Sequence, residues 1–174
     1  LSCLVGSEMC IRDRSYIDEA KDNGCEVIEI NPAEEDFEQQ EHYKIPPTLL
    51  INPDDNLKVM QEEIFGPILP IKTYKEFGET IDYVNKKDRP LGLYYFGSNN
   101  NELSTVLNKT TSGGVTVNDV IFHVAQDNAP FGGVGPSGMG SYHGEEGFKN
   151  FSHAKTIFTQ TKLDNVISVF RPPY

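Results

Sequence analysis

Six of the fifteen residues from Pro130 to Gly144 are glycine, and this stretch constrains the fold more than any other part of the chain. Glycine reaches positive φ freely and lets other groups approach the backbone closely, at an entropic cost when it is ordered. Flexible linkers lack large apolar anchors, whereas Phe131, Met139 and Tyr142 lie inside this stretch. The pattern therefore predicts an ordered loop whose backbone passes close to a ligand or to another chain.

Length, charge and cysteine content limit the class of protein. A chain of 174 residues fits one domain of ordinary size. Its formal net charge of −11 argues against a nucleic-acid partner, which needs a basic face. The cysteines Cys3, Cys10 and Cys25 form neither a disulfide framework nor a CxxC zinc motif. We therefore expect no metal site and a reducing, cytoplasmic setting.

The first fourteen residues differ in character from the rest. The segment from Ser7 to Arg14, SEMCIRDR, resembles translated sequencing-adaptor sequence. We therefore predict that residues 1–14 are a non-native leader and that the native chain begins near Ser15. The alternative is a short, disordered native terminus.

Strand-like and helix-like segments alternate after the leader, which predicts an α/β domain with a largely parallel sheet. The spacing of Ile17 and Ala20 predicts a helix over 15–23, and Gly24 is a suitable C-terminal stop. Further helices are expected over 74–87 and 99–109, with a helical turn at 145–150. Strands are expected over 25–30, 48–51, 68–73, 91–96, 113–117 and 152–160.

Two acidic residues, Glu62 and Glu63, stand just before Phe65 and a Gly-Pro turn. One carboxylate has two acceptor oxygens and can bind both vicinal hydroxyls of a ribose. Phe65 could then pack on a planar ring beside that sugar. Chemistry alone favours the alternative, in which two ordinary surface acids precede a buried phenylalanine.

A GxGxxG pattern at Gly133, Gly135 and Gly138 invites a dinucleotide-binding interpretation. That fingerprint requires a strand before it, a helix that opens inside it, and an acidic residue about 20 positions later. Phe158 stands 20 positions after Gly138, and neither flank has the required pattern. We therefore reject a Rossmann-type site.

The histidines and the central cysteine give weak signals. His123, His143 and His153 have no i, i+4 spacing, so structural roles are expected rather than metal binding or base catalysis. Cys25 lies in a strand-like run without an activating base or helix N-terminus nearby, so we expect a plain, half-buried thiol.

Several motifs together resemble the C-terminal half of an aldehyde dehydrogenase. They are EEIFGP at 62–67, PFGG at 130–133 and SGMG at 137–140. Further segments, KIPPT at 44–48, VND at 117–119 with His123, SYHG at 141–144 and FSH at 151–153, resemble the class 3 branch, nearest to its coniferyl-aldehyde dehydrogenases. The resemblance runs from about Ser15 to the end. It implies a truncated aldehyde dehydrogenase-like catalytic domain, a mostly parallel sheet with flanking helices.

The resemblance also implies an activity and site residues. The family oxidises an aldehyde, here possibly an aromatic, coniferyl-type one, to the acid through a cysteine thioester, with NAD or NADP as coenzyme. Glu63 matches the glutamate that holds the nicotinamide ribose, and Phe65 the aromatic residue beside the nicotinamide. Phe131 matches the phenylalanine of the aldehyde-binding region. Residues 152–160 match the segment around the oligomerisation strand, so a homodimer is expected for the full-length protein.

The family's catalytic residues are missing from the chain. Neither Gly-Gln-x-Cys nor Glu-Leu-Gly-Gly, the contexts of the nucleophile and the general base, occurs in it. We assign residues 15–135 to part of the catalytic domain, and 136–174 to the Gly-rich loop, the oligomerisation strand and a C-terminal tail. We therefore expect no catalytic residue and no activity in the isolated chain. The alternative function is a non-catalytic module that binds or dimerises with a full-length paralogue.

Overall fold

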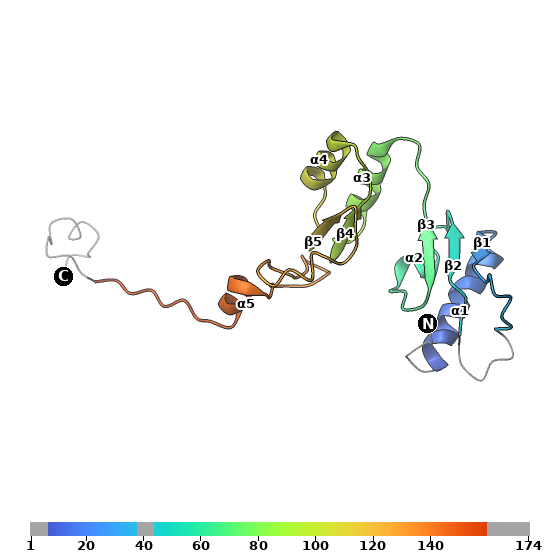
Figure 1. The fold of residues 1–174 in the computed structure, drawn as a ribbon, viewed down its shortest axis with the longest axis horizontal. Coiled ribbons are helices and arrows are strands. Elements are labelled where there is room, and N and C mark those ends of the chain that lie inside the picture. The colour runs from blue at the N-terminus through green and yellow to red at the C-terminus, as the bar shows by residue number, and fades with distance from the viewer. Residues whose placement is uncertain (1–6, 38–43, 160–174) are drawn as a thin grey trace, which may run out of the picture. The chain divides into compact units, whose positions relative to one another are not determined.

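The computed structural model describes residues 7–37 and 44–159, although of residues 7–10 only the backbone (Figure 1). The chain divides into two compact units, one up to Glu76 and one from Phe77. Each unit combines helices with a small sheet, so the expected α/β class is confirmed. No helix in these two ranges is long and apolar enough to cross a membrane.

A three-stranded sheet forms the centre of the first unit, with its strands in the order β1-β2-β3. Strand β1 (Glu26–Glu29) runs antiparallel to β2 (Thr48–Ile51), and β2 runs parallel to β3 (Ile68–Ile71). Pro70 cannot donate a ladder hydrogen bond, and it lies in β3 at the end of this order.

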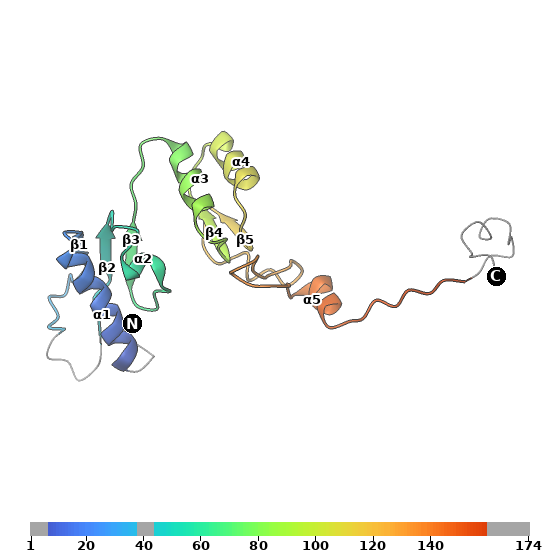
Figure 2. The ribbon, with the colours of Figure 1, turned by 180° about the vertical axis from the view of Figure 1, so that it is seen from behind.

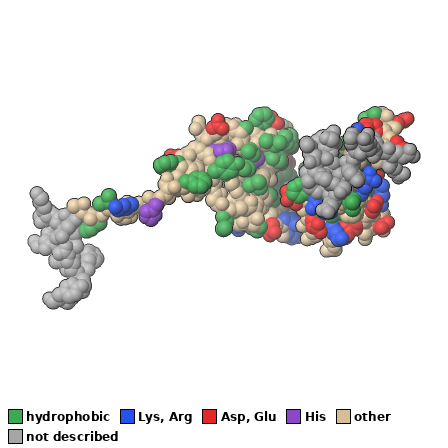
Figure 3. All heavy atoms as spheres, turned by 90° about the horizontal axis from the view of Figure 1, so that it is seen from below, with side chains coloured by type: hydrophobic (Ala, Val, Ile, Leu, Met, Phe, Trp, Pro, Cys, Tyr) green, Lys and Arg blue, Asp and Glu red, His purple; other side chains and the backbone are tan. Residues whose placement is uncertain are grey.

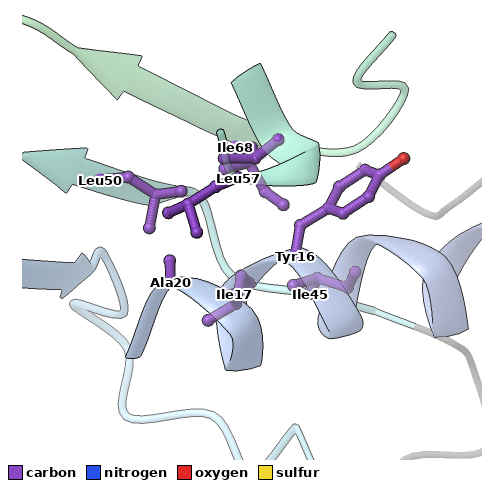
Figure 4. Close-up of a cluster of buried hydrophobic side chains, with 8 residues drawn as sticks. Tyr16, Ile17, Ala20, Ile45, Leu50, Leu57 and Ile68 are labelled. Atoms are coloured by element: carbon purple, nitrogen blue, oxygen red, sulfur yellow. The ribbon is translucent and has the colours of Figure 1, made fainter. Parts of the chain in front are cut away.

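Helix α1 (Ser7–Asp22) packs against this sheet and supplies one face of the core (Figures 1 and 4). Tyr16, Ile17 and Ala20 lie on that face and are almost fully buried. The remaining buried members are Ile45, Leu50, Leu57, Val59 and Ile68. Burial of each large apolar side chain contributes about 1.5–3 kcal/mol. The short helix α2 (Lys58–Gln61), which was not expected, carries Val59 into this core.

The two ends of α1 differ in how well the sequence predicts them. At the C-terminal end, Gly24 adopts φ +75°. There the amide of Gly24 donates to the carbonyl of Lys21, and that of Cys25 to the carbonyl of Ala20. This pair of bonds is the Schellman arrangement, which satisfies carbonyls left free at a helix end. At the N-terminal end α1 begins at Ser7 rather than near Ser15, so it runs through part of the expected leader.

The second unit contains a parallel strand pair, β4 (Gly92–Tyr95) and β5 (Gly114–Val117), connected by helix α4 (Asn100–Lys109). Helices α3 (Phe77–Lys86) and α4 lie together beside this pair in both views (Figures 1 and 2). Buried Ile81, Tyr95 and Val106 form the core between them. A parallel pair needs such a crossover, so the expected alternation of strands and helices is confirmed.

Helix α5 (Gly144–Asn150) confirms the expected helical turn, but the expected strand at 152–160 is wrong over its described part. Residues 152–159 are irregular and exposed, and residue 160 lies outside the described ranges. A strand is stable only when a neighbouring strand satisfies its backbone N–H and C=O groups. No described segment pairs with this one, so its alternating pattern alone does not produce a strand.

Candidate functional site

The loop from Glu62 to Pro67 connects α2 to β3 and carries the predicted coenzyme-binding residues. Ile64 is half-buried and packs against the core of the first unit. The flanking residues Glu63 and Phe65 are both exposed, Phe65 by 59%. The alternative interpretation, in which Phe65 is buried, is therefore wrong.

The two neighbouring carboxylates of this loop have different surroundings. The Tyr16 hydroxyl donates a 2.7 Å hydrogen bond to Oε2 of Glu62. Within the described ranges no hydrogen bond or ion pair engages the carboxylate of Glu63, although its backbone carbonyl accepts a 3.4 Å bond from Arg12. Glu63, the residue expected to hold a ribose, is therefore the acid with free acceptor oxygens.

Arg12 and Asp13 of α1 lie against this loop. The Arg12 guanidinium carbon is 5.2 Å from the centroid of the Phe65 ring and 5.7 Å from that of Tyr16. Asp13 is fully buried, and neither carboxylate oxygen has a hydrogen-bond partner among the described residues. Burial raises the pKa of the Asp13 carboxyl, and the Arg12 guanidinium opposes this shift from 3.9 Å away. A Cβ at Gly66 would be 2.3 Å from Asp13 Oδ2, so a larger residue there would have to displace the Asp13 side chain.

The second unit carries Phe131, the predicted aldehyde-binding residue, in a half-buried position. The backbones of Phe131 and Tyr142 exchange two hydrogen bonds of 2.9 Å. Their rings meet edge to face, with centroids 5.5 Å apart. This two-residue bridge closes the glycine-rich loop and holds Phe131 at its base.

The reason for the glycines differs from the expected one. A Cβ at Gly132 would be 2.2 Å from the carbonyl oxygen of Gly140, and one at Gly133 would be 2.2 Å from that of Ser137. Ser137 Oγ also accepts a 2.9 Å bond from the backbone amide of Val134. The close approach is therefore made by the loop's own backbone, and the expected contact with a ligand or another chain is not needed to explain it.

The same loop agrees with the rejection of a Rossmann-type site. Gly133, Gly135 and Gly138 lie in an irregular segment, and the next helix, α5, opens only at Gly144. A dinucleotide fingerprint needs a strand directly before the glycines and a helix that begins within them. Neither is present in this part of the described structure.

Two of the residues that gave weak signals, Cys25 and His123, make contacts within the fold. Cys25 is half-buried, and its Sγ lies 3.3 Å from the carbonyl oxygen of Ile51. His123 is bound to Thr116, with 2.8 Å between Nδ1 and Oγ1. No group of three or more potential metal ligands occurs within residues 7–37 and 44–159.

The structure brings Glu63 and Phe65 together on one loop of the first unit, whereas Phe131 belongs to the second unit. The sequence did not reveal the residues that support them, namely Tyr16, which bonds to Glu62, and His123 and Tyr142, whose rings contact Phe131. Each of these contacts joins segments without a periodic relationship in the sequence. No local signal identifies them.

Comparisons with known proteins place these features in context. The model of the "Aldehyde dehydrogenase family" matches residues 4–157. A probable coniferyl aldehyde dehydrogenase of Caulobacter vibrioides is 62% identical over 99% of this chain and 36% of that protein. Rat aldehyde dehydrogenase family 3 member A2 is 54% identical over 74% of this chain and 27% of that protein. The chain therefore spans about a third of the length of these relatives.

Solved structures of aldehyde dehydrogenases also resemble this chain. Staphylococcus aureus AldH in a substrate-bound state superimposes with a TM-score of 0.76 at 34% identity, over 97% of this chain and 38% of that one. A double mutant of Staphylococcus aureus betaine aldehyde dehydrogenase, in complex with NAD+, gives a TM-score of 0.70 at 29% identity, over 84% of this chain and 29% of that one.

Proposed function

Because this chain belongs to the aldehyde dehydrogenase family, we propose that it is the C-terminal part of an enzyme that oxidises an aldehyde to a carboxylic acid. Family membership supports an oxidoreductase with a nicotinamide coenzyme. The similarity to a probable coniferyl aldehyde dehydrogenase supports an aromatic aldehyde as the substrate. The coenzyme is NAD or NADP. We also propose that the protein is cytoplasmic.

We assign Glu63 and Phe65 to the coenzyme. The observation that carries this assignment is the contrast between two adjacent acids: Tyr16 engages Glu62 and leaves the Glu63 carboxylate free beside an exposed ring. When bound, the nicotinamide accepts a hydride from the substrate. Glu63 would accept hydrogen bonds from two vicinal ribose hydroxyls, and Phe65 would offer its ring face to the nicotinamide.

Phe131 is assigned to the aldehyde side of the site. Its ring is half-buried and fixed by the backbone bridge to Tyr142, so it offers a firm apolar wall. A rigid aromatic wall excludes water and favours a planar, apolar substrate, which suits an aromatic aldehyde.

The activity is tested in a chimera, in which this chain replaces the segment that it matches in the Caulobacter vibrioides relative. Glu63→Gln should raise the KM for the coenzyme about tenfold or more, because it weakens charge-assisted hydrogen bonds to the ribose. Glu62→Gln is the matched control and should change this KM by less than about twofold. Equal effects of the two substitutions would refute the assignment of Glu63.

The isolated chain should be inactive, because it contains neither of the family's catalytic motifs. Purified chain, NAD and an aromatic aldehyde should yield no more NADH than a mixture without protein. Aldehyde-dependent NADH formation above that level would overturn this part of the proposal.

Residues 1–14 remain a proposed non-native leader. Three of the four buried polar side-chain atoms without a partner in the described structure belong to Arg12 and Asp13. Native proteins satisfy most buried polar groups, so this mismatch favours a foreign origin, whereas the family model already matches from residue 4 onward. The DNA upstream of the Ser15 codon, read from an independent assembly, tests it: in-frame Gly-Gln-x-Cys and Glu-Leu-Gly-Gly codons are expected.

A dimerisation role is the second candidate, and the exposed end of the described chain favours it. Phe151, Ile157 and Phe158 are 92%, 79% and 75% exposed, beside backbone groups that have no strand partner among residues 7–37 and 44–159. The space-filling view also shows hydrophobic side chains on the surface of the second unit (Figure 3). Light scattering on the purified chain should reveal a dimer if this segment pairs with a second copy, and a monomer if it does not.

A further inference from the structure

The imidazole of His123 packs against the sheet of the second unit, at a position where two glycines leave space for it. Gly92 of β4 and Gly114 of β5 are register partners. A Cβ at Gly114 would be 2.3 Å from His123 Cδ2, and one at Gly92 would be 3.4 Å from His123 Cε1. The ring therefore occupies space that a larger residue at position 114 would take.

Thr116 fixes the orientation of this ring. Its Oγ1 lies 2.8 Å from His123 Nδ1 and accepts a 3.3 Å hydrogen bond from the backbone amide of His123. Thr116 is buried, and within the described ranges its hydroxyl hydrogen has no acceptor other than Nδ1. In the arrangement that satisfies both of these groups, the hydroxyl donates to Nδ1 and the neutral ring carries its proton on Nε2.

The ring held in this way contacts Phe131. The centroids of His123 and Phe131 are 5.8 Å apart with an angle of 46° between the planes, and Tyr94 contacts His123 at 5.9 Å. Phe131 also contacts Tyr142 at 5.5 Å and His143 at 6.3 Å. The position of the Phe131 ring is thus supported from β5 by His123 and from the glycine-rich loop by Tyr142.

We propose that His123 is a positioning residue for aldehyde binding, which acts by holding the Phe131 ring while Thr116 holds His123. The inference rests on the proposed role of Phe131 at the aldehyde. Without the Thr116 hydroxyl, His123 loses its fixed tautomer and orientation, and Phe131 loses one of its ring contacts. Aldehyde binding should weaken, whereas coenzyme binding should not change.

The tautomer is tested on the 174-residue chain itself by NMR of the imidazole nitrogens at neutral pH. His123 should carry its proton on Nε2 in the original chain and in Thr116→Ser, which keeps the hydroxyl. Thr116→Val removes the hydroxyl at similar shape and should give a mixture of tautomers. A His123 proton on Nδ1 in the original chain would overturn the proposal.

The positioning role is tested in the chimera described above. Thr116→Val should raise the aldehyde KM about fivefold, as expected for one lost hydrogen bond, with the coenzyme KM within about twofold. His123→Asn retains an acceptor near the Nδ1 position but lacks the ring. It should also raise the aldehyde KM and leave the coenzyme KM unchanged, even if Thr116→Val folds poorly. Thr116→Ser should restore most of the affinity. Thr105→Val, which removes a hydroxyl bonded within exposed α4, is the control and should change neither KM.

The outcomes separate this inference from the function on which it rests. An active chimera whose aldehyde KM is unchanged by both Thr116→Val and His123→Asn overturns the positioning role alone. An inactive chimera overturns the proposed function, and the positioning role with it.

Discussion

The hydroxyl of Tyr16 donates a 2.7 Å hydrogen bond to Oε2 of Glu62, and this bond distinguishes two adjacent carboxylates. Tyr16 is 1% exposed, so the bond joins the core of the first unit to the loop that carries Glu63 and Phe65. Burial and the bond to Glu62 raise the pKa of the Tyr16 hydroxyl. The same contact thus anchors the candidate coenzyme loop and leaves Glu63 free.

Tyr16→Phe should destabilise the first unit by about 1 kcal/mol, because it removes one hydrogen bond to a carboxylate that is itself exposed. Urea unfolding followed by circular dichroism measures this change. Tyr94→Phe is the control, because no described residue accepts a hydrogen bond from the Tyr94 hydroxyl. Equal losses in the two variants would show that the bond to Glu62 contributes nothing.

The raised pKa of Tyr16 also predicts a pH dependence. The unfolded chain releases the Tyr16 proton near the ordinary pKa of about 10, whereas the folded chain retains it to higher pH. The contribution to stability is therefore complete below about pH 10 and is lost as the pH rises through the folded-state pKa. The free energy of unfolding should fall more steeply above pH 10 in the original chain than in Tyr16→Phe.

Asp13→Asn should stabilise the first unit at pH 7. The Asp13 carboxyl is buried without a hydrogen-bond partner among the described residues, and burial raises its pKa, so its charged form is disfavoured. The stability gained from a raised carboxyl pKa is complete below the unfolded value of about 4 and is lost as the pH rises through the folded value. Asparagine keeps the shape of the protonated acid without that loss.

Thermal unfolding at several pH values tests this prediction. The advantage of Asp13→Asn should be clear at pH 7 and should shrink toward pH 4. Asp18→Asn, on an exposed position of the same helix, controls for the change in net charge. A lower melting temperature for Asp13→Asn than for the original chain at pH 7 would contradict the prediction.

The sequence predicts local structure well where one residue decides it. Gly24 was assigned as the stop of α1 from its position alone, and it has the positive φ that glycine tolerates. The helix expected over 99–109 is present as α4, and the side chain of Asn99 caps its first turn. Local rules sufficed at these positions because the decisive hydrogen bonds join residues within five positions of one another.

Features that depend on distant segments were missed or misjudged. The strand expected at 152–160 fails over its described part, because a strand needs a partner that this chain does not supply. The glycine-rich loop is predicted to pass close to a ligand or another chain, whereas the groups nearest to the Cβ positions of Gly132 and Gly133 belong to the loop's own backbone. The sequence shows that close packing occurs there but not which group approaches.

Gly132→Ala should destabilise the second unit strongly, by about 2 kcal/mol or more. Its new Cβ would lie 2.2 Å from the carbonyl oxygen of Gly140, and backbone cannot yield as a flexible side chain can. Gly78→Ala is the matched control, because nothing lies within 4 Å of its Cβ position and it is part of α3. The control should be neutral or stabilising by up to about 1 kcal/mol. Similar denaturation midpoints for the two variants would argue against the self-packed loop.

Asn99→Ala should destabilise α4 by about 1 kcal/mol, the usual cost of losing a side-chain cap. The Asn99 side chain accepts hydrogen bonds from the amides of Asn101 at 3.0 Å and Glu102 at 3.3 Å, and alanine leaves both amides unsatisfied. Asn100→Ala, one position into the same helix, removes no capping hydrogen bond and should leave the stability of α4 unchanged. Amide hydrogen exchange gives the sharpest measurement, because the first turn of α4 should exchange faster in Asn99→Ala while α3 stays unchanged.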